Sequence, residues 1–122
     1  MIFRRKSHLK ELSAAELHEA LQHDRIVLVD VREPSEYAAE RIHGALLFPL
    51  SSFDPKALPI DPSRPVVLQC GSGKRSATAA ARCGAAGVPV DMHLKGGIAA
   101  WKAAGLRTVS IDANTGAVID RK

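Results

Sequence analysis

Short apolar runs alternate with amphipathic stretches along most of this chain. The apolar runs are short and rich in β-branched residues, which is typical of strands covered on both faces of a parallel sheet. They lie at residues 26–29, 46–48, 66–69 and 90–93, and a short edge strand is expected near Leu9. Between these runs, apolar residues recur at the spacing of an amphipathic helix. The pattern predicts an α/β domain with a central, mostly parallel five-stranded sheet and helices on both faces.

Helix boundaries are marked by capping residues. Ser13 to Glu16 has the form of a capping box, and the leucines that follow recur at helical spacing, so we expect a helix from about Ala14 to His23. Pro34 opens a short second helix, at a position where its missing N–H costs nothing. We expect a third helix from about Ser76 to Ala86 and a fourth that carries Trp101.

One domain accounts for the whole length of 122 residues, because a chain of this size can bury about two thirds of its unfolded surface. Its core spans about residues 8–108, residues 1–7 form a basic, frayed end, and residues 110–122 form a hairpin or a loose tail. A turn signal at 112–116 lies between two short apolar segments, and both the hairpin and the loose tail remain open. Aromatic residues make up only 4% of the chain, so aliphatic side chains must fill the core.

The candidate chemistry lies in the loop Cys70-Gly71-Ser72-Gly73-Lys74-Arg75-Ser76, between a predicted buried strand and a predicted helix. The first N–H groups of a helix lack intrahelical partners and its dipole is positive there, so a thiolate and a neighbouring anion are both favoured. In such places the thiol pKa falls from about 8.5 to between roughly 3.5 and 7.5. Cys70 is therefore a candidate nucleophile, with the loop residues Gly71, Ser72, Gly73, Lys74, Arg75 and Ser76 as the substrate-binding cradle.

Cys83 is expected to be a different kind of cysteine. It lies within a predicted helix, and no cationic loop surrounds it. Free cysteines are commonly small buried hydrophobes, and we interpret Cys83 as one.

Three further polar residues follow the predicted strand 26–29, at the edge where open α/β sheets carry their sites. We expect Asp30, Arg32 and Glu36 to support the loop structurally, with Arg32 and Glu36 forming an ion pair. His43 could act as a base for Cys70, but a surface or packing role is the stronger interpretation.

The net charge of +4 suits an anionic substrate, although the basic residues are spread along the chain rather than gathered into a stripe. We therefore expect no nucleic-acid partner. The histidines and cysteines show no metal-ligand spacing, so no metal and no cofactor are expected. No apolar segment follows the basic start or is long enough to cross a bilayer, which favours a cytoplasmic protein without a membrane partner.

Two phosphate-binding motifs resemble the loop but do not fit. A nucleotide P-loop needs Gly where Leu68 stands and Ser or Thr where Arg75 stands. A loop of the tyrosine-phosphatase kind has five residues between Cys and Arg, and here four separate Cys70 from Arg75. The smaller ring disfavours a phosphatase or arsenate reductase.

Taken together, three segments resemble the rhodanese-like domain family. They are Val29-Asp30-Val31-Arg32-Glu33 with Glu36-Tyr37 and then Ile42-His43-Gly44-Ala45, the Cys70 loop, and Lys95-Gly96-Gly97-Ile98 with Trp101. The resemblance covers about residues 8–108. One departure is that Glu40-Arg41 replaces the Gly-His that often precedes this Ile-x-Gly-Ala approach.

The resemblance implies a parallel sheet with flanking helices and a sulfurtransferase activity. Cys70 would take a sulfane sulfur from a small anionic donor such as thiosulfate, hold it as a persulfide, and pass it to cyanide or a thiol. Arg75, and with it Lys74, would face the anionic donor. The alternative is a sulfur-relay or regulatory module whose acceptor is a partner protein.

Overall fold

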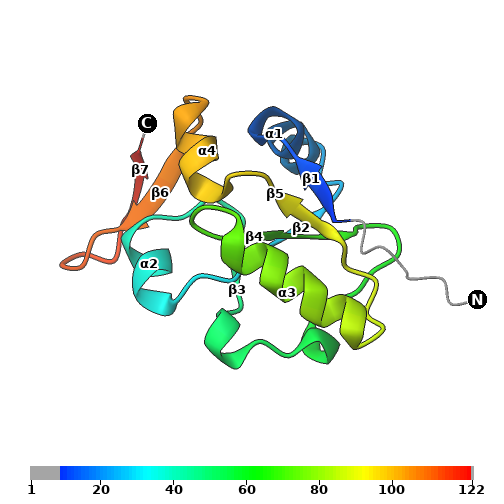
Figure 1. The fold of residues 1–122 in the computed structure, drawn as a ribbon. Helices are drawn as coiled ribbons and strands as arrows, with labels where there is room; N and C mark the ends of the chain where they lie inside the picture. The colour runs from blue at the N-terminus through cyan, green and yellow to red at the C-terminus, as the bar shows by residue number, and fades with distance from the viewer. Residues whose placement is uncertain (1–8, 122) are drawn as a thin grey trace, which may run out of the picture.

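The computed structural model describes residues 9–121 (Figure 1). The predicted basic, frayed end at residues 1–7 lies outside the described residues. The described chain forms a five-stranded sheet, four α-helices, two short 3-10 turns and a two-stranded hairpin.

Every strand pair in the central sheet is parallel, and the strand order is β1-β5-β4-β2-β3. This confirms the predicted five-stranded α/β architecture. β4 is the middle strand, and all four of its residues are buried, as the uninterrupted apolar run predicted. The elements are β1 (Lys10–Leu12), α1 (Ala14–Gln22), β2 (Val27–Asp30), α2 (Pro34–Ala39), β3 (Leu46–Leu47), β4 (Val66–Gln69), α3 (Lys74–Ala85), β5 (Met92–Leu94), α4 (Gly97–Ala103), β6 (Thr108–Ile111) and β7 (Val118–Arg121).

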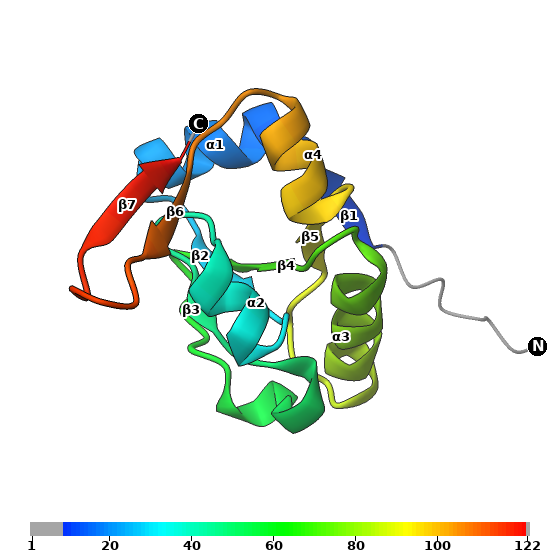
Figure 2. The same cartoon turned by 90° about the vertical axis from the view of Figure 1, so that its left-hand side faces the viewer.

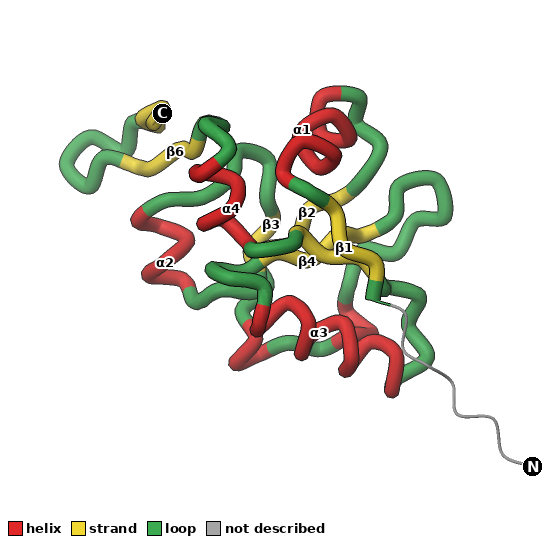
Figure 3. The backbone as a smooth tube through the Cα atoms, turned by 45° about the horizontal axis from the view of Figure 1, so that its top comes forward, coloured by secondary structure: helices red, strands yellow, loops and turns green. Residues whose placement is uncertain are grey.

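Helices cover both faces of this sheet (Figure 3). On one face, α3 packs its alanines and Cys83 against Val66 and Leu68 of β4. On the other face, α1 and α4 pack Leu17 and Trp101 around Val67. Because side chains of a strand alternate between faces, the run at 66–69 supplies both cores. Cys83 has no exposed surface and lies in the first core, which confirms its prediction as a buried core residue.

The C-terminal segment is a hairpin, β6 paired antiparallel with β7, and the alternative of a loose tail is wrong. The hairpin forms a separate sheet beside α2 (Figure 2). An isolated bridge joins Arg41 to Val109, and Glu40 accepts a hydrogen bond from the Thr108 hydroxyl. These contacts fasten the hairpin to the segment after α2. Among the described residues, no helix has the length and apolar character needed to cross a membrane.

Two predicted elements begin two residues away from their observed starts. The strand expected at 90–93 begins at Met92, because its pairing with β4 and β1 starts there. The helix expected from Ser76 begins at Lys74, with Gly73 as its cap at φ +102°. The earlier start places Lys74, Arg75 and Ser76 in the first turn of α3.

Candidate active site

Cys70 lies directly after the central strand, where β4 ends and the loop into α3 begins. Its position at the carboxyl end of β4 agrees with the sequence analysis. The cysteine has no exposed surface and belongs to the core on the α3 side. The site is therefore a buried sulfur at the positive end of a twelve-residue helix.

Backbone N–H groups of the loop point at this sulfur. The N–H of Gly73 lies 3.1 Å from Cys70 Sγ and that of Ser76 lies 3.3 Å away. The Ser76 hydroxyl is 3.5 Å from the sulfur. Burial, the largest single influence, raises the pKa of Cys70, but hydrogen bonds from the Ser76 hydroxyl and from the N–H groups of Ser76, Gly73 and Ser72 outweigh it. The pKa of Cys70 is thus lowered, which favours the thiolate.

The first turn of α4 fixes the backbone of the loop from the other side. The N–H of Ile98 donates to the Cys70 carbonyl at 2.8 Å, and that of Ala99 donates to the Gly71 carbonyl at 3.2 Å. This close approach requires glycine at position 97, where a Cβ would lie 2.3 Å from the Cys70 carbonyl oxygen. The Gly-Gly pair before Ile98 thereby explains how the third segment of the sequence motif contributes to the site.

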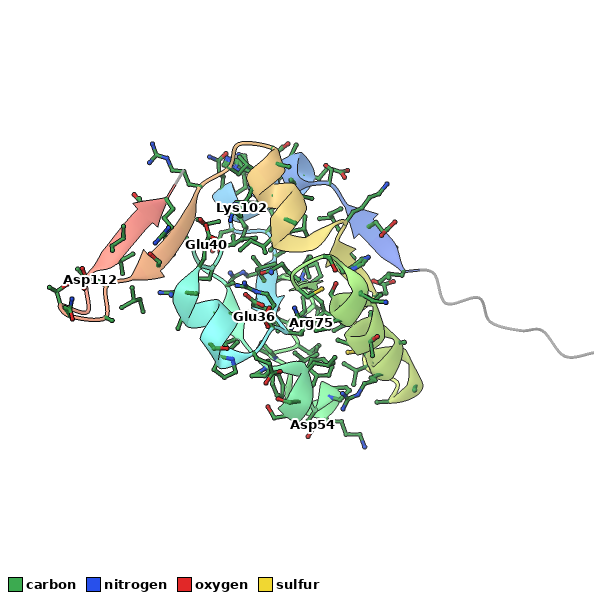
Figure 4. All side chains as sticks on the ribbon, turned by 60° about the vertical axis from the view of Figure 1, so that its left-hand side comes forward. Glu36, Glu40, Asp54, Arg75, Lys102 and Asp112 are labelled. Atoms are coloured by element: carbon green, nitrogen blue, oxygen red, sulfur yellow. The ribbon has the colours of Figure 1, made fainter. Side chains whose placement is uncertain are left out.

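Arg75 does not present a free cation beside Cys70. Its guanidinium makes a bidentate ion pair with Glu36 of α2, at 2.7 and 2.9 Å (Figure 4). The Arg75 side chain is 37% exposed and lies against Gly71. Lys74 is exposed and makes no ion pair among the described residues. The positive charge available to an anion at this loop therefore comes from Lys74, the helix dipole and a partly neutralised Arg75.

The predicted ion pair between Arg32 and Glu36 is wrong. Arg32 instead pairs with Asp30, at 2.8 Å and with both side chains buried, and it also donates to the Glu40 carbonyl at 2.7 Å. Arg32 is only two residues from Asp30, so its side chain can fold back to pair with the Asp30 carboxylate. Glu36 then pairs with Arg75. The Asp30–Arg32 pair holds the end of β2 and the end of α2 together, and this is a supporting role.

The Glu36–Arg75 pair predicts a specific acid dependence of stability. The hydrogen bond from Arg75, the largest influence, lowers the pKa of Glu36 from 4.5 to about 2. A lowered carboxyl pKa stabilises the fold above the unfolded value, and this contribution is lost as the pH falls from 4.5 through about 2. Relative to Glu36→Gln, the wild type should therefore lose its advantage in unfolding free energy in that window, as measured by urea denaturation against pH.

Arg75→Gln is the matched control for this prediction, because it removes the same pair from the other side. The two variants and the double variant should show the same residual pH dependence. Since both side chains are more than one third exposed, we expect at most about 1 kcal/mol at neutral pH. An advantage of the wild type that persists unchanged at pH 2 would contradict the prediction.

Two residues at the site were missed by the sequence analysis, His93 and Glu11. His93 Nδ1 lies 2.7 Å from the Ser76 hydroxyl, and His93 Nε2 lies 3.0 Å from Glu11 Oε2. His43, considered as a base for Cys70, is exposed and lines a hollow of about 840 Å³ on the α1 and α4 side of the sheet. The sequence signal for His93 was a polar residue between the apolar Met92 and Leu94 of a strand. Because side chains alternate along a strand, His93 faces the side opposite to Met92 and Leu94, which is the side that carries α3.

Among residues 9–121, no three His, Cys, Asp or Glu side chains are grouped so that they could hold a metal ion. The groups that contact Cys70 Sγ are the N–H groups of Gly73 and Ser76 and the Ser76 hydroxyl. They are suited to stabilise an anion.

Comparisons with known proteins identify the family and the fold. The family model described as rhodanese-like domain matches residues 13–104. An uncharacterized protein of Synechocystis, slr1261, is 45% identical over 93 residues, which cover 76% of this chain and 52% of that protein. A sulfurtransferase of Allochromatium vinosum is 38% identical over 85 residues, 70% of this chain and 79% of that protein.

A solved structure of a thiosulfate sulfurtransferase from Pseudomonas aeruginosa has the same fold. Its TM-score is 0.76 at 26% identity, over 84% of this chain and 20% of that one. This chain thus spans about half the length of slr1261 and a fifth of the Pseudomonas protein. The family model covers most of the chain, and the fold agrees with it. The chain belongs to the rhodanese-like domain family.

Proposed function

We propose that this protein is a sulfurtransferase that carries a sulfane sulfur as a persulfide on Cys70, with thiosulfate as a donor. The observation that carries the proposal is the pair of N–H groups, from Gly73 and Ser76, aimed at a cysteine sulfur whose pKa is lowered. The relative from Allochromatium, named a sulfurtransferase, supports the reaction class.

The reaction needs only the thiolate and the cradle. The Cys70 thiolate attacks the outer sulfur of thiosulfate, the sulfur–sulfur bond of the donor breaks, and sulfite leaves with the electron pair. Cyanide or a thiol then attacks the outer sulfur of the persulfide, and the Cys70 thiolate is regenerated. Both steps pass through a sulfur anion on Cys70, which the preorganised N–H groups stabilise without rearranging.

Access to the sulfur requires a local movement of the loop, because Cys70 has no exposed surface in this structure. The partly exposed Arg75 side chain lies against Gly71, and its exchange between Glu36 and an incoming anion would both open the loop and bind the donor. In this proposal Arg75 binds the donor after leaving Glu36.

The test is intact-protein mass spectrometry after incubation with thiosulfate. The wild type should gain the mass of one sulfur atom, Cys70→Ser should gain none, and Cys83→Ala should gain it as the wild type does. Cys83 is the matched control because it is the second cysteine of the chain and burial raises its pKa. No gain from any sulfane donor, or a gain that survives in Cys70→Ser, would reject the proposal.

The acceptor is tested with the same labelled protein. Cyanide, a small thiol and a protein thiol are offered in turn, and the loss of the added mass is timed. Fastest transfer to the protein thiol would favour the sulfur-relay alternative. Hydrolysis of an aryl phosphate that disappears in Cys70→Ser would instead indicate a phosphatase.

A further inference from the structure

An unbroken chain of hydrogen bonds leads from the buried cysteine to the surface. It runs from Cys70 Sγ to the Ser76 hydroxyl at 3.5 Å, on to His93 Nδ1 at 2.7 Å, and from His93 Nε2 to Glu11 at 3.0 Å. Cys70 and Ser76 have no exposed surface, and the His93 side chain is 3% exposed. The Glu11 side chain is 47% exposed, so the chain ends in water.

The parallel sheet builds this chain from three segments that are distant in sequence. The register places His93 of β5 beside Leu68 of β4 on one side and beside Glu11 of β1 on the other. The first turn of α3 brings Ser76 over the same face. Both contacts of His93 are therefore fixed by strand register and by the helix start, not by mobile loops.

Each group in the chain can change roles in a coordinated way. The Glu11 carboxylate accepts from His93 Nε2–H, which leaves Nδ1 facing the Ser76 hydroxyl. With Nδ1 unprotonated, the hydroxyl donates to His93 and its oxygen accepts from the Cys70 thiol. With Nδ1 protonated, the ring donates to the hydroxyl oxygen, and the hydroxyl donates to the Cys70 thiolate. The two arrangements differ only in the positions of two protons.

We propose that Ser76, His93 and Glu11 form a proton path that takes up the thiol proton of Cys70. The S–H bond breaks as its proton passes to the Ser76 oxygen, and the hydroxyl proton passes to His93 Nδ1. The products are a thiolate and an imidazolium, and no other reactant is needed. His93 and Glu11 are positioning residues, since they act on Cys70 through Ser76. The proposal rests on Cys70 acting as a nucleophile.

Burial explains why such a path is useful at this site. With the loop closed as in this structure, the Cys70 sulfur has no exposed surface and does not contact water, whereas the Glu11 side chain does. Three ion pairs lie near the path, Glu36–Arg75 and Asp30–Arg32 around the loop and Lys10–Asp91 beside Glu11. The exposed Lys74 is a further cation in the first turn of α3. His93 faces Ser76, and its ring can accept a proton to become a cation.

The experiment measures the rate of Cys70 alkylation by iodoacetamide against pH, with peptide mass spectrometry to separate Cys70 from Cys83. His93→Asn keeps a hydrogen-bonding group near Ser76 but cannot hold the proton. We expect the midpoint of the Cys70 profile to rise by about one pH unit, and the rate below the midpoint to fall about tenfold. Glu11→Gln, at a half-exposed position outside the core, should shift it in the same direction by less.

Asp91→Asn is the matched control, because it removes one carboxylate from the same strand edge without touching the path. It should leave the profile unchanged. Superimposable profiles for the wild type, His93→Asn and Glu11→Gln would overturn the proposal, and so would an equal shift in Asp91→Asn.

A second measurement follows the proton itself, by nitrogen NMR of the His93 ring. The Nδ1 signal should differ between the wild type and Cys70→Ser, because only in the wild type does a thiol supply the proton that the Ser76 hydroxyl passes on. Identical spectra in both proteins would mean that His93 only positions the hydroxyl, and would overturn the proton path. Neither measurement needs sulfur transfer. The thiosulfate test can therefore fail while the proton path is confirmed, and the two failures can be told apart.

Discussion

Arg32→Met is expected to lower the unfolding free energy by about 3–5 kcal/mol, because it leaves a buried carboxylate without its partner. Asp30 has no exposed surface, and the Arg32 side chain that pairs with it at 2.8 Å is 6% exposed. The substitution also removes the bond from Arg32 to the Glu40 carbonyl, which joins the end of α2 to β2. Typical domains have about 5–15 kcal/mol in total, so the loss should be plain in urea denaturation at neutral pH.

Arg64→Met is the matched control for this effect. Arg64 pairs with Asp24 at 2.6 Å, but their side chains are 40% and 79% exposed, so we expect a loss below about 1 kcal/mol. The double variant Asp30→Asn, Arg32→Met should recover part of the loss, since no charge then remains buried. Equal losses in Arg32→Met and Arg64→Met would show that burial of the first pair has no energetic consequence.

The parts of the fold that the sequence predicted are those set by local pattern. The apolar run at Val66–Gln69 is a strand in the structure, the capping box at Ser13 begins α1, and the turn at 112–116 lies between β6 and β7. In each case the signal is a periodicity or a cap that acts within a few residues. The position of Cys70 follows from the same local order of strand, loop and helix.

The partners of the charged side chains could not be predicted, because pairing depends on distances that sequence does not contain. Arg32 and Glu36 have a plausible spacing, yet Arg32 folds back to Asp30 and Glu36 meets Arg75, which is 39 residues away. Glu11 and His93 are separated by 82 residues and meet only through the register of β1 and β5. Residues joined by sheet register therefore need the structure.

Gly97→Ala is expected to damage the loop and the stability together. The new Cβ would lie 2.3 Å from the Cys70 carbonyl oxygen and 2.6 Å from the Gly71 carbonyl carbon, at φ +63°. Overpacking against backbone and a left-handed conformation together cost about 3 kcal/mol. Relief of the clash has to move α4 or the Cys70–Gly71 backbone, which breaks the hydrogen bond from Ile98 to Cys70.

Gly105→Ala separates the two causes, because Gly105 ends the same helix at φ +78° with no atom within 4 Å of the added Cβ. It should cost only the conformational strain, about 1 kcal/mol, and should leave the alkylation profile of Cys70 unchanged. Gly97→Ala should cost more and should raise the midpoint of that profile, because displaced N–H groups stabilise the thiolate less. If both variants behaved alike, the N–H groups around Cys70 would be held by α3 alone, and the contact with α4 would be packing without influence on the sulfur.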